Sequence, residues 1–352
     1  GRTEAVGAEF DLPDDDPLTV LSSLLEQFTA PHAQECGFPG GVPPLHGGLV
    51  GYLAYDAVRY VEHLPDAPPD DRGLPEMVWH VGGALAAIDR FRETILIIRN
   101  VIAGDDPAAS YDEALAAIER DVERLSNAPK RPLAARPSFD AVAPAIANSS
   151  REDYEAAVRR SIEFIKAGDA FQIVPSIRFE VEFDGDAFAV YRALRLVNPS
   201  PFMYFVRHNS ISIAGSSPEL MTRVRDGIVY SRPIAGTRPR GADPAADADL
   251  EAELLADPKE RAEHVMLIDL ARNDLGRVCE FGTIAVDDLM VIERYSHVMH
   301  IVSGVSGVVR AGLGPVDVLR ATFPHGTVTG APKIRAMEII DELEPTARGP
   351  YA

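Results

Sequence analysis

Residues 321–340 join a Gly/Thr-rich turn to the start of an amphipathic helical pattern, and such a junction can bind an anion. The stretch reads ATFPHGTVTGAPKIRAMEII. Thr329 or Gly330 can cap a helix whose first residue is Pro332, so the free amides of the first turn and the charge of Lys333 would attract an anion. The predicted buried stripe comprises Ile334, Met337, Ile340 and Leu343. The residues leave an anion site and a well-capped connector both open, and they exclude a P-loop because Ala-Pro-Lys follows the second glycine.

Two glutamates on a predicted helix over residues 257–278 could bind a divalent cation. Asp257 and Pro258 match the N-cap and the first position, and Glu260 matches the third. Glu263 follows one turn later, on an inward stripe that continues with Leu267, Leu270 and Asp274. A carboxylate among leucines is costly unless it is paired or bound to a cation, and Mg²⁺ prefers oxygen ligands. The alternative is an exposed helix face on which the glutamates pair with Arg261 or Lys259.

Three arginines surround a predicted turn in a chain that is acidic almost everywhere else. Arg232, Arg238 and Arg240 flank Ala-Gly-Thr in SRPIAGTRPRG. Guanidinium groups beside exposed amides fit a carboxylate or a phosphate. The alternative is an ordinary surface turn, because Pro/Gly turns that bear arginine are common.

Two histidines, His297 and His300, lie three residues apart in ERYSHVMHIVSGV, which we predict to be a strand. Their side chains would point to opposite faces of that strand, so only one of them can face a given site. For a lone histidine, a packing or surface role is the commoner interpretation.

Composition describes a globular protein and disfavours nucleic-acid binding. The 352 residues are 46% hydrophobic and carry a formal net charge of −20, which would repel a phosphate backbone. No apolar run approaches the roughly 20 residues of a membrane span, and the beginning GRTEAVGAEF has no signal pattern, so we expect a cytoplasmic protein without membrane contact. Cys36 and Cys279 lack metal-ligand spacing, which argues against a disulfide framework and a zinc site.

Hydrophobic periodicity predicts two regions. The first contains a helix over residues 18–28, a strand and helix in GGLVGYLAYDAVRYVE, a hairpin in ALAAIDRFRETILIIRNVI and a helix over 111–125. A Pro/Ala-rich stretch over 127–150 is predicted to be a linker, which divides the chain into an N-terminal region with linker, residues 1–140, and a C-terminal region, residues 141–352.

The second region is predicted to mix helices with hairpins. Ser150 caps a helix to about residue 167, FQIVPSIRFEVEF reads as one strand with Phe179, Val181 and Phe183 on its apolar face, and a helix over 186–196 precedes strand-rich sequence. This mixture indicates the α+β class, because no regular strand-helix-strand rhythm is present.

Several long stretches resemble the chorismate-utilising enzymes and, within them, the large subunits of anthranilate synthases. They are PIAGTRPRG, ERAEHVMLIDLARNDLGRVCEFG, RYSHVMHIVSG and TFPHGTVTGAPKIRAMEIIDELEPTARGPY, in the same order from about residue 150 to the end. The resemblance implies two packed, mainly antiparallel β-sheets flanked by helices. It further implies conversion of chorismate and ammonia to anthranilate and pyruvate, the first committed step of tryptophan biosynthesis.

Two positions bear on the choice within this family. Gln172 stands where family members that add water to chorismate carry a basic lysine, and glutamine cannot deprotonate water. Ala235 stands where aminodeoxychorismate synthases typically carry a lysine that attacks the ring, and alanine cannot do so. Both residues favour direct addition of ammonia, as in anthranilate synthase.

The resemblance assigns roles to individual residues. Glu263 would be a Mg²⁺ ligand with Glu260 as its neighbour, Glu219 would be the acid that protonates the departing 4-hydroxyl, and His300 would act in the loss of pyruvate. Glu219 must then be held protonated by its surroundings. Thr327 would be catalytic as well as in contact with chorismate, and the further predicted substrate contacts are Gln172, Ala235, Gly236, Thr237, Gly326, Gly330 and Tyr351.

Part of a tryptophan feedback pocket is implied by NPSPFMYF, with Asn198, Pro201, Met203 and Tyr204 at matching places. The alternative is a turn followed by a core strand. The other half of that pocket in the family is a Leu-Leu-Glu-Ser element, which this sequence lacks. Family members also continue past the last residue here with an arginine and a second metal-binding glutamate, so we expect this chain to be a fragment.

A glutamine amidotransferase subunit is the implied partner, because neither cysteine has the context of a nucleophile elbow. Three alternatives stay open: an aminodeoxychorismate synthase, an enzyme that stops at 2-amino-2-deoxyisochorismate, and a non-catalytic module that binds chorismate or tryptophan.

Overall fold

The computed structural model describes residues 15–28, 42–102, 105–129, 143–295 and 297–351. Contacts between Cα atoms divide the chain into two units, and each is considered by itself. The first comprises Gly1–Tyr52 and Met77–Leu133, and the second comprises Leu53–Glu76 and Ala134–Ala352. The domain boundary at residue 140 stays a prediction. Of the predicted linker, residues 130–142 lie outside the described residues, and its end forms a short strand, Ile146–Ala147.

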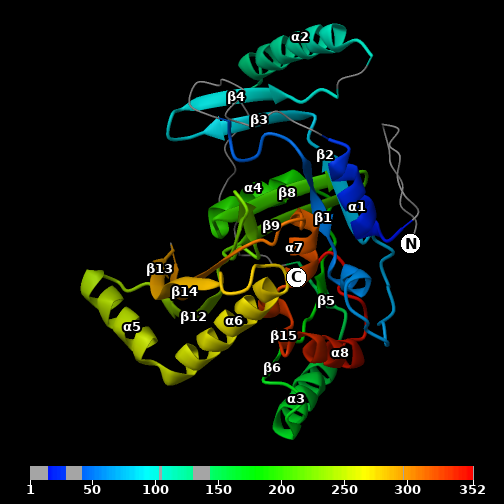
Figure 1. The fold of residues 1–352 in the computed structure, drawn as a ribbon. Coiled ribbons are helices and arrows are strands. Elements are labelled where there is room, and N and C mark those ends of the chain that lie inside the picture. The colour runs from blue at the N-terminus through cyan, green and yellow to red at the C-terminus, as the bar shows by residue number, and fades with distance from the viewer. Residues whose placement is uncertain (1–14, 29–41, 103–104, 130–142, 296, 352) are drawn as a thin grey trace. The chain divides into compact units, whose positions relative to one another are not determined.

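The described part of the first unit contains two α-helices, an antiparallel hairpin and a further pair of strands (Figure 1). Its elements are α1 (Pro17–Glu26), the pair of β1 (Leu49–Leu53) and β2 (Met77–Val81), the hairpin of β3 (Ala84–Asp89) and β4 (Thr94–Arg99), and α2 (Pro107–Ser126). Asp16 caps α1 through the amides of Leu18 and Thr19. The predicted helices over 18–28 and 111–125 and the hairpin are confirmed, whereas the helix predicted after β1 is a 3-10 helix, η1 (Tyr55–Tyr60), of the second unit.

The second unit carries the sequence stretches that could do chemistry. Its elements are η1 (Tyr55–Tyr60), β5 (Ile146–Ala147), α3 (Arg151–Ala167), β6 (Gln172–Ile173), β7 (Phe179–Glu180), α4 (Ala187–Val197), β8 (Phe202–His208), β9 (Ile211–Ser217), β10 (Arg223–Arg225), β11 (Ile228–Ser231), β12 (Ile234–Pro239), α5 (Pro244–Ala256), α6 (Pro258–Gly276), β13 (Ala285–Arg294), β14 (Val298–Val308), α7 (Pro315–Thr322), η2 (Gly326–Val328), β15 (Gly330–Ala331) and α8 (Lys333–Leu343). This mixture confirms the predicted α+β class.

The largest sheet of the second unit is antiparallel and is built around β14. One edge of β14 pairs with β12 and then with β11, which pairs with β10, and its other edge pairs with β13. The ladders β5–β7, β6–β15 and β8–β9 are also antiparallel. The register of β12 shifts between Ala235 and Thr237, where Gly236 adopts a φ of +68°, so β12 is bulged.

Helix α6 packs on this sheet and contacts β12 and β14, as Figure 1 shows. Its buried face joins Val229 and Val305 of the sheet in one hydrophobic cluster, to which α6 contributes Ile268, Ala271 and Leu275. The caps are local and follow the sequence: Asp257 accepts hydrogen bonds from the amides of Lys259 and Glu260 at 2.9 and 3.2 Å, and Ser150 caps α3 in the same way. Both predicted caps are therefore confirmed.

The prediction of a single strand across FQIVPSIRFEVEF is wrong. Only Gln172–Ile173 and Phe179–Glu180 are strands, and they pair with different partners, β15 and β5. Phe179, Val181 and Phe183 are each at least half exposed. The alternation of apolar and charged residues predicts extended backbone, but Pro175 lies between the two short strands. A local pattern cannot predict which distant strand each of them pairs with.

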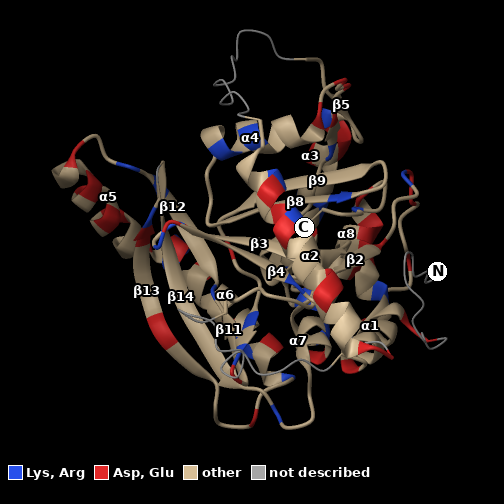
Figure 2. Ribbon diagram, turned by 90° about the horizontal axis from the view of Figure 1, so that it is seen from above, with Lys and Arg blue, Asp and Glu red and all other residues tan. Residues whose placement is uncertain are grey.

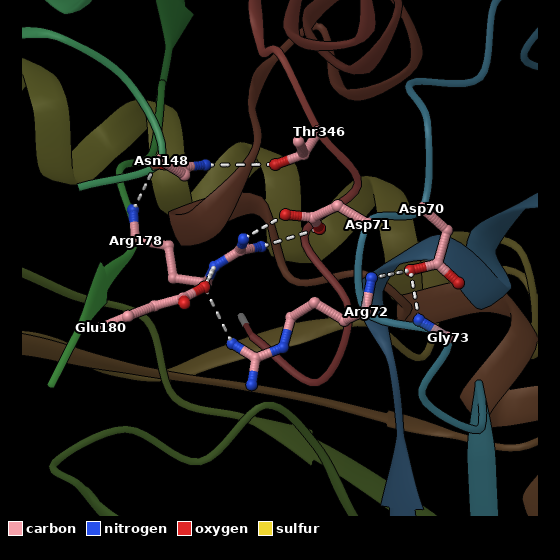
Figure 3. Close-up of polar contacts among 8 residues, drawn as sticks. All are labelled: Asp70, Asp71, Arg72, Gly73, Asn148, Arg178, Glu180 and Thr346. Atoms are coloured by element: carbon pink, nitrogen blue, oxygen red, sulfur yellow. Dashed lines mark hydrogen bonds and ion pairs between the residues drawn. The ribbon is translucent and has the colours of Figure 1, made fainter. Parts of the chain in front are cut away.

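A polar network joins segment Leu53–Glu76 to the C-terminal part of the second unit (Figure 3). Arg178 donates hydrogen bonds to both carboxylate oxygens of Asp71 and to Glu180, and Arg72 donates to Glu180 at 3.4 Å. Asp70 accepts hydrogen bonds from the amides of Arg72 and Gly73 at 3.0 Å, which closes the turn. The network explains why this segment groups with residues far along the chain.

Acidic residues are spread over many elements, including α5, in keeping with the net charge of −20 (Figure 2). Within the described residues, no helix combines the length and the apolar character that crossing a membrane requires.

Candidate active site

Glu219 follows β9 and is enclosed by two other segments of the second unit. Its Oε1 accepts a hydrogen bond from the Thr327 hydroxyl of η2 at 3.1 Å and from the Ile234 amide of β12 at 3.4 Å. Its side chain is 15% exposed. Burial raises the pKa of Glu219 to about 7, although both hydrogen bonds oppose that change. A carboxyl group with a pKa near the working pH can serve as a general acid.

His300 lies on β14 beside the bulge of β12. Its Nδ1 is 2.9 Å from the Thr237 hydroxyl and 3.2 Å from the Gly236 carbonyl oxygen, and its ring packs edge-on against Tyr295. A carbonyl oxygen can only accept, so this arrangement assigns the hydrogen to Nδ1 and leaves the lone pair on Nε2. His300 can therefore take up a proton through Nε2.

His297 occupies a different kind of position. It is exposed and lies before the first residue of β14, and its carbonyl oxygen accepts the Arg240 amide at 3.0 Å. The prediction that both histidines lie in one strand is wrong for His297, because β13 ends at Arg294 and β14 begins only at Val298.

Glu260 and Glu263 both lie half-buried on α6, as the stripe predicted. Arg238 of β12 donates a hydrogen bond to Glu260 at 3.4 Å, and the side-chain amide of Gln172 on β6 donates one to Glu263 at 3.3 Å. The alternative pairing of these glutamates with neighbours on their own helix is wrong, because Arg261 instead donates to the Leu255 carbonyl. Two glutamates one turn apart thus face strands on which predicted substrate contacts also lie.

A metal site is only partly formed by these residues. Among the residues that the structure describes, no group of three or more His, Cys, Asp and Glu side chains could hold a metal ion. The carboxylate of Glu263 has suitable oxygen donors and no cationic side chain paired with it in the described part of the chain. Glu260, by contrast, shares the single guanidinium group of Arg238 with Glu253 and Asp257. The described chain therefore offers one available carboxylate and not a full set of ligands.

The three arginines are not an anion site. Arg232 pairs with Glu293 and Asp288, and Arg240 pairs with Asp247. Arg238 contacts three carboxylates, from Glu253, Asp257 and Glu260. The expected turn is the bulged strand β12, and the acidic partners lie on α5, α6 and β13, so the sequence around the arginines could not disclose them.

Lys333 also does not lend its charge to an exposed anion site. Its ammonium group is buried, donates to Asp274 at 2.7 Å and reaches the Thr322 carbonyl at 3.3 Å. The helix begins at Lys333 with Pro332 as the N-cap, one residue later than predicted. Met337 and Ile340 are buried as expected, but Ile334 is 44% exposed because the helix presents Lys333 to the core instead.

The turn before α8 is closely packed. A Cβ atom on Gly326 would lie 1.8 Å from Leu270 of α6, and one on Gly330 would lie 2.1 Å from the carbonyl oxygen of Gln172. The backbone amides of Val328 and Thr329 donate hydrogen bonds within the turn, so the predicted anion site could use only other amides. Both glycines hold Thr327 in place between α6 and β6.

One titratable neighbour of Glu219 was missed in the sequence. His325 Nδ1 lies 3.7 Å from Glu219 Oε1, and the side chains are 17% and 15% exposed. Burial lowers the pKa of His325 to about 4, with a contribution from Lys333. The available signal was its position two residues before Thr327 in the same turn.

Two further groups of predicted residues lie elsewhere in the second unit. Tyr351 is 59% exposed, and its amide donates to the Gly349 carbonyl at 2.7 Å. The residues predicted to contact tryptophan lie at the junction of α4 and β8. There the Asn198 carbonyl oxygen accepts a hydrogen bond from the Ser216 hydroxyl at 2.7 Å. Met203 is half-buried and Tyr204 is 49% exposed. Their roles stay predictions.

Comparison with known proteins identifies the class that this fold and site define. A sequence profile described as "chorismate binding enzyme" matches residues 5–352, and the chain belongs to that family. The menaquinone-specific isochorismate synthase of Escherichia coli shares the fold, with a TM-score of 0.68 over 96% of this chain and 69% of that one, at 16% identity.

Within the family, the chain belongs with the anthranilate synthase component 1 proteins. It is 48% identical to that protein of Pseudomonas aeruginosa over 344 residues, covering 96% of this chain and 68% of the relative. It is 47% identical to the one of Thermus thermophilus, covering 94% and 69%. The crystal structure of anthranilate synthase component I from Streptococcus pneumoniae matches with a TM-score of 0.83 at 34% identity, covering 97% of this chain and 73% of that one. The chain thus spans about two thirds of the length of these relatives.

Proposed function

We propose that this chain is the chorismate-binding part of an anthranilate synthase, which converts chorismate and ammonia to anthranilate and pyruvate. The observation that carries the proposal is the enclosed carboxyl group of Glu219, whose pKa burial raises to about 7, beside the Thr327 hydroxyl. The names of the most similar relatives support the same reaction.

The first step is addition of ammonia at C2 of the chorismate ring with loss of the 4-hydroxyl. Glu219 gives its proton to the departing oxygen, which leaves as water, and the carboxyl group becomes a carboxylate. Gln172 contributes no base, and none is needed because ammonia already carries a lone pair. The pKa of Glu219 suits this role, since about half of the acid is protonated at neutral pH.

The second step is loss of the enolpyruvyl side chain as pyruvate, with aromatisation of the ring. The ring must lose its proton at C2, and the side chain must gain one. His300 is the residue that we assign to this proton transfer, because its Nδ1 is occupied by Gly236 and Thr237 while Nε2 keeps its lone pair.

Mg²⁺ is the cofactor that we propose, with Glu263 as a ligand. When bound, the ion would neutralise a carboxylate of chorismate. Glu260 could contribute through a water molecule while it stays paired with Arg238. Further ligands must come from the substrate, from water or from residues outside those described.

Aminodeoxychorismate synthase is the competing enzyme, and Ala235 argues against it. This residue is 8% exposed on β12 and pairs with Ile301 of β14. It offers no nucleophile for attack on the ring.

Ammonia would come from a glutamine amidotransferase partner. The relatives' designation as component 1 supports a second component. We further propose that tryptophan binds at the α4–β8 junction as a feedback inhibitor, with Asn198, Pro201, Met203 and Tyr204 as contacts. We expect Met203→Ala to lose inhibition by tryptophan and to keep wild-type turnover when tryptophan is absent.

The activity test supplies chorismate, Mg²⁺ and an ammonium salt to the protein that carries this chain, without any amidotransferase. We expect anthranilate fluorescence and pyruvate in equal amounts. Accumulation of 4-amino-4-deoxychorismate without pyruvate would refute the proposal in favour of the competing enzyme. Binding of chorismate without any turnover would instead indicate a non-catalytic module.

A further inference from the structure

His325 and Glu219 are two titratable side chains enclosed in the same place. Nδ1 of His325 lies 3.7 Å from Oε1 of Glu219, and each side chain is less than one fifth exposed. The two hydrogen-bond donors to the same oxygen, the Thr327 hydroxyl and the Ile234 amide, do not titrate near neutral pH. The imidazole can do so, and its remaining exposure gives it access to protons from solvent.

Burial and one nearby positive charge keep His325 neutral while Glu219 is protonated. Burial is the larger cause that disfavours the imidazolium form, and the positive charge of Lys333 on α8 adds to it. Lys333 is held there by Asp274 of α6 at 2.7 Å. Arg277 and Glu62 are the other charged groups acting on that pair, and they have opposite signs.

Loss of the proton from Glu219 changes this balance. A carboxylate about 4 Å from an imidazolium, in surroundings of effective permittivity about 20, raises the proton affinity of the imidazole by roughly a thousandfold. That increase brings the pKa of His325 from about 4 into the neutral range. His325 therefore gains a proton when Glu219 has lost one, and the two groups titrate as a coupled pair.

We propose that His325 returns a proton to Glu219 after each turnover. This inference rests on the proposed function, in which Glu219 protonates the departing hydroxyl. The carboxylate that remains draws a proton from solvent onto His325, and the Nδ1–H bond then breaks as the O–H bond of Glu219 forms again. One proton enters from solvent and one leaves with the released water. His325 is a positioning residue, because it acts on the substrate only through Glu219.

The first experiment measures the coupling without relying on activity. Histidine labelled with ¹³C and ¹⁵N is incorporated, and the imidazole signal of His325 is followed by NMR from pH 4 to pH 9. We expect a midpoint near 7 in the wild type and a roughly thousandfold lower proton affinity in Glu219→Gln. The signal of the exposed His297 serves as the internal control in both proteins. Equal midpoints for His325 in both proteins would overturn the proposal.

The second experiment measures turnover at saturating chorismate and ammonium. His325→Gln keeps a polar side chain of similar size but cannot carry the proton, so kcat should fall by about a hundredfold. His325→Ala should lose as much and regain turnover when imidazole is added, whereas imidazole should leave the wild type and His297→Gln unchanged. Wild-type kcat in His325→Gln, or no recovery of His325→Ala with imidazole, would count against the proposal.

These two experiments separate the inference from the proposed function. A wild-type protein that forms no anthranilate refutes the proposed function. The NMR titration still reports whether Glu219 controls the protonation of His325 in that case.

Discussion

Replacing Lys333 by methionine would leave Asp274 buried without its counter-ion. The two side chains are 8% and 6% exposed, and Nζ lies 2.7 Å from Oδ2. Methionine has a similar shape but cannot donate to Asp274 or to the Thr322 carbonyl. Removing one partner of a buried ion pair costs about 3–5 kcal/mol. We therefore expect Lys333→Met to lower the free energy of unfolding by that amount at pH 7.

The pH dependence of this loss follows from the pKa of Asp274. In the wild type, burial raises that pKa to about 6 in spite of Lys333. A carboxyl group whose pKa is higher in the folded state than in the unfolded state destabilises the folded state when pH is above the unfolded-state pKa. This penalty grows with pH and stops growing once pH exceeds the folded-state pKa. Without Lys333 the pKa rises further, so the penalty keeps growing by about 1.4 kcal/mol per pH unit. The difference between variant and wild type should be about 2.3 kcal/mol larger at pH 8 than at pH 6, because Asp274 of the wild type is only half ionised at pH 6.

Urea unfolding at pH 6, 7 and 8, followed by circular dichroism, measures both effects. Lys259→Met provides a matched control, because Lys259 is exposed at the start of α6 and its loss should cost little. The double variant Lys333→Met with Asp274→Asn should recover most of the stability and lose the extra pH dependence. The reasoning is refuted if the single variant is equally destabilised at pH 6 and pH 8, or if the double variant is no more stable than the single one.

Three further predictions concern the acid, the turn and a buried histidine. Glu219→Gln should reduce anthranilate formation by about 10²–10⁴-fold. The wild-type rate should fall as pH rises through about 7, because Glu219 then loses its proton, and the variant should lack this fall. A variant with the same pH–rate profile as the wild type would contradict this. Gly326→Ala places a Cβ atom 1.8 Å from Leu270 and should cost about 1–3 kcal/mol in thermal unfolding, whereas Gly83→Ala, with open space around it, should be neutral. Burial lowers the pKa of His264 to about 4. The neutral buried imidazole therefore lowers the free energy of unfolding as pH falls from about 6.5 to 4, and His264→Gln should reduce this loss by about 3 kcal/mol in urea unfolding. An equal loss in both proteins would show that another group is responsible.

Local signals in the sequence located the helices and their caps. Ser150 and Asp257 supply oxygen atoms to amides two or three residues away, and that interaction needs no distant partner. The inward stripe of α6 was equally readable, because helical periodicity places Glu263 and Leu267 on one face. The position of Thr327 in a close turn before a helix also followed from its glycine and proline neighbours.

Partners that are distant in sequence could not be predicted. Arg238 and Lys333 were considered as possible anion-binding residues, but carboxylates on other elements bind them instead. The raised pKa of Glu219 depends on burial by η2 and β12, which lie 15 or more residues further along the chain. Phe179 was expected to be packed and is 62% exposed, because the short strands β6 and β7 belong to separate ladders.

Strand β12 serves both proposed proton-transfer positions. The Ile234 amide holds Glu219, and Thr237, three residues later, holds His300. The strand thus fixes a spacing of about 10 Å between these two backbone positions, and the bulge at Gly236 is part of that spacing. A one-residue deletion in β12 would change that spacing, so we expect it to impair both proposed proton transfers, whereas a substitution at His300 should impair only the second.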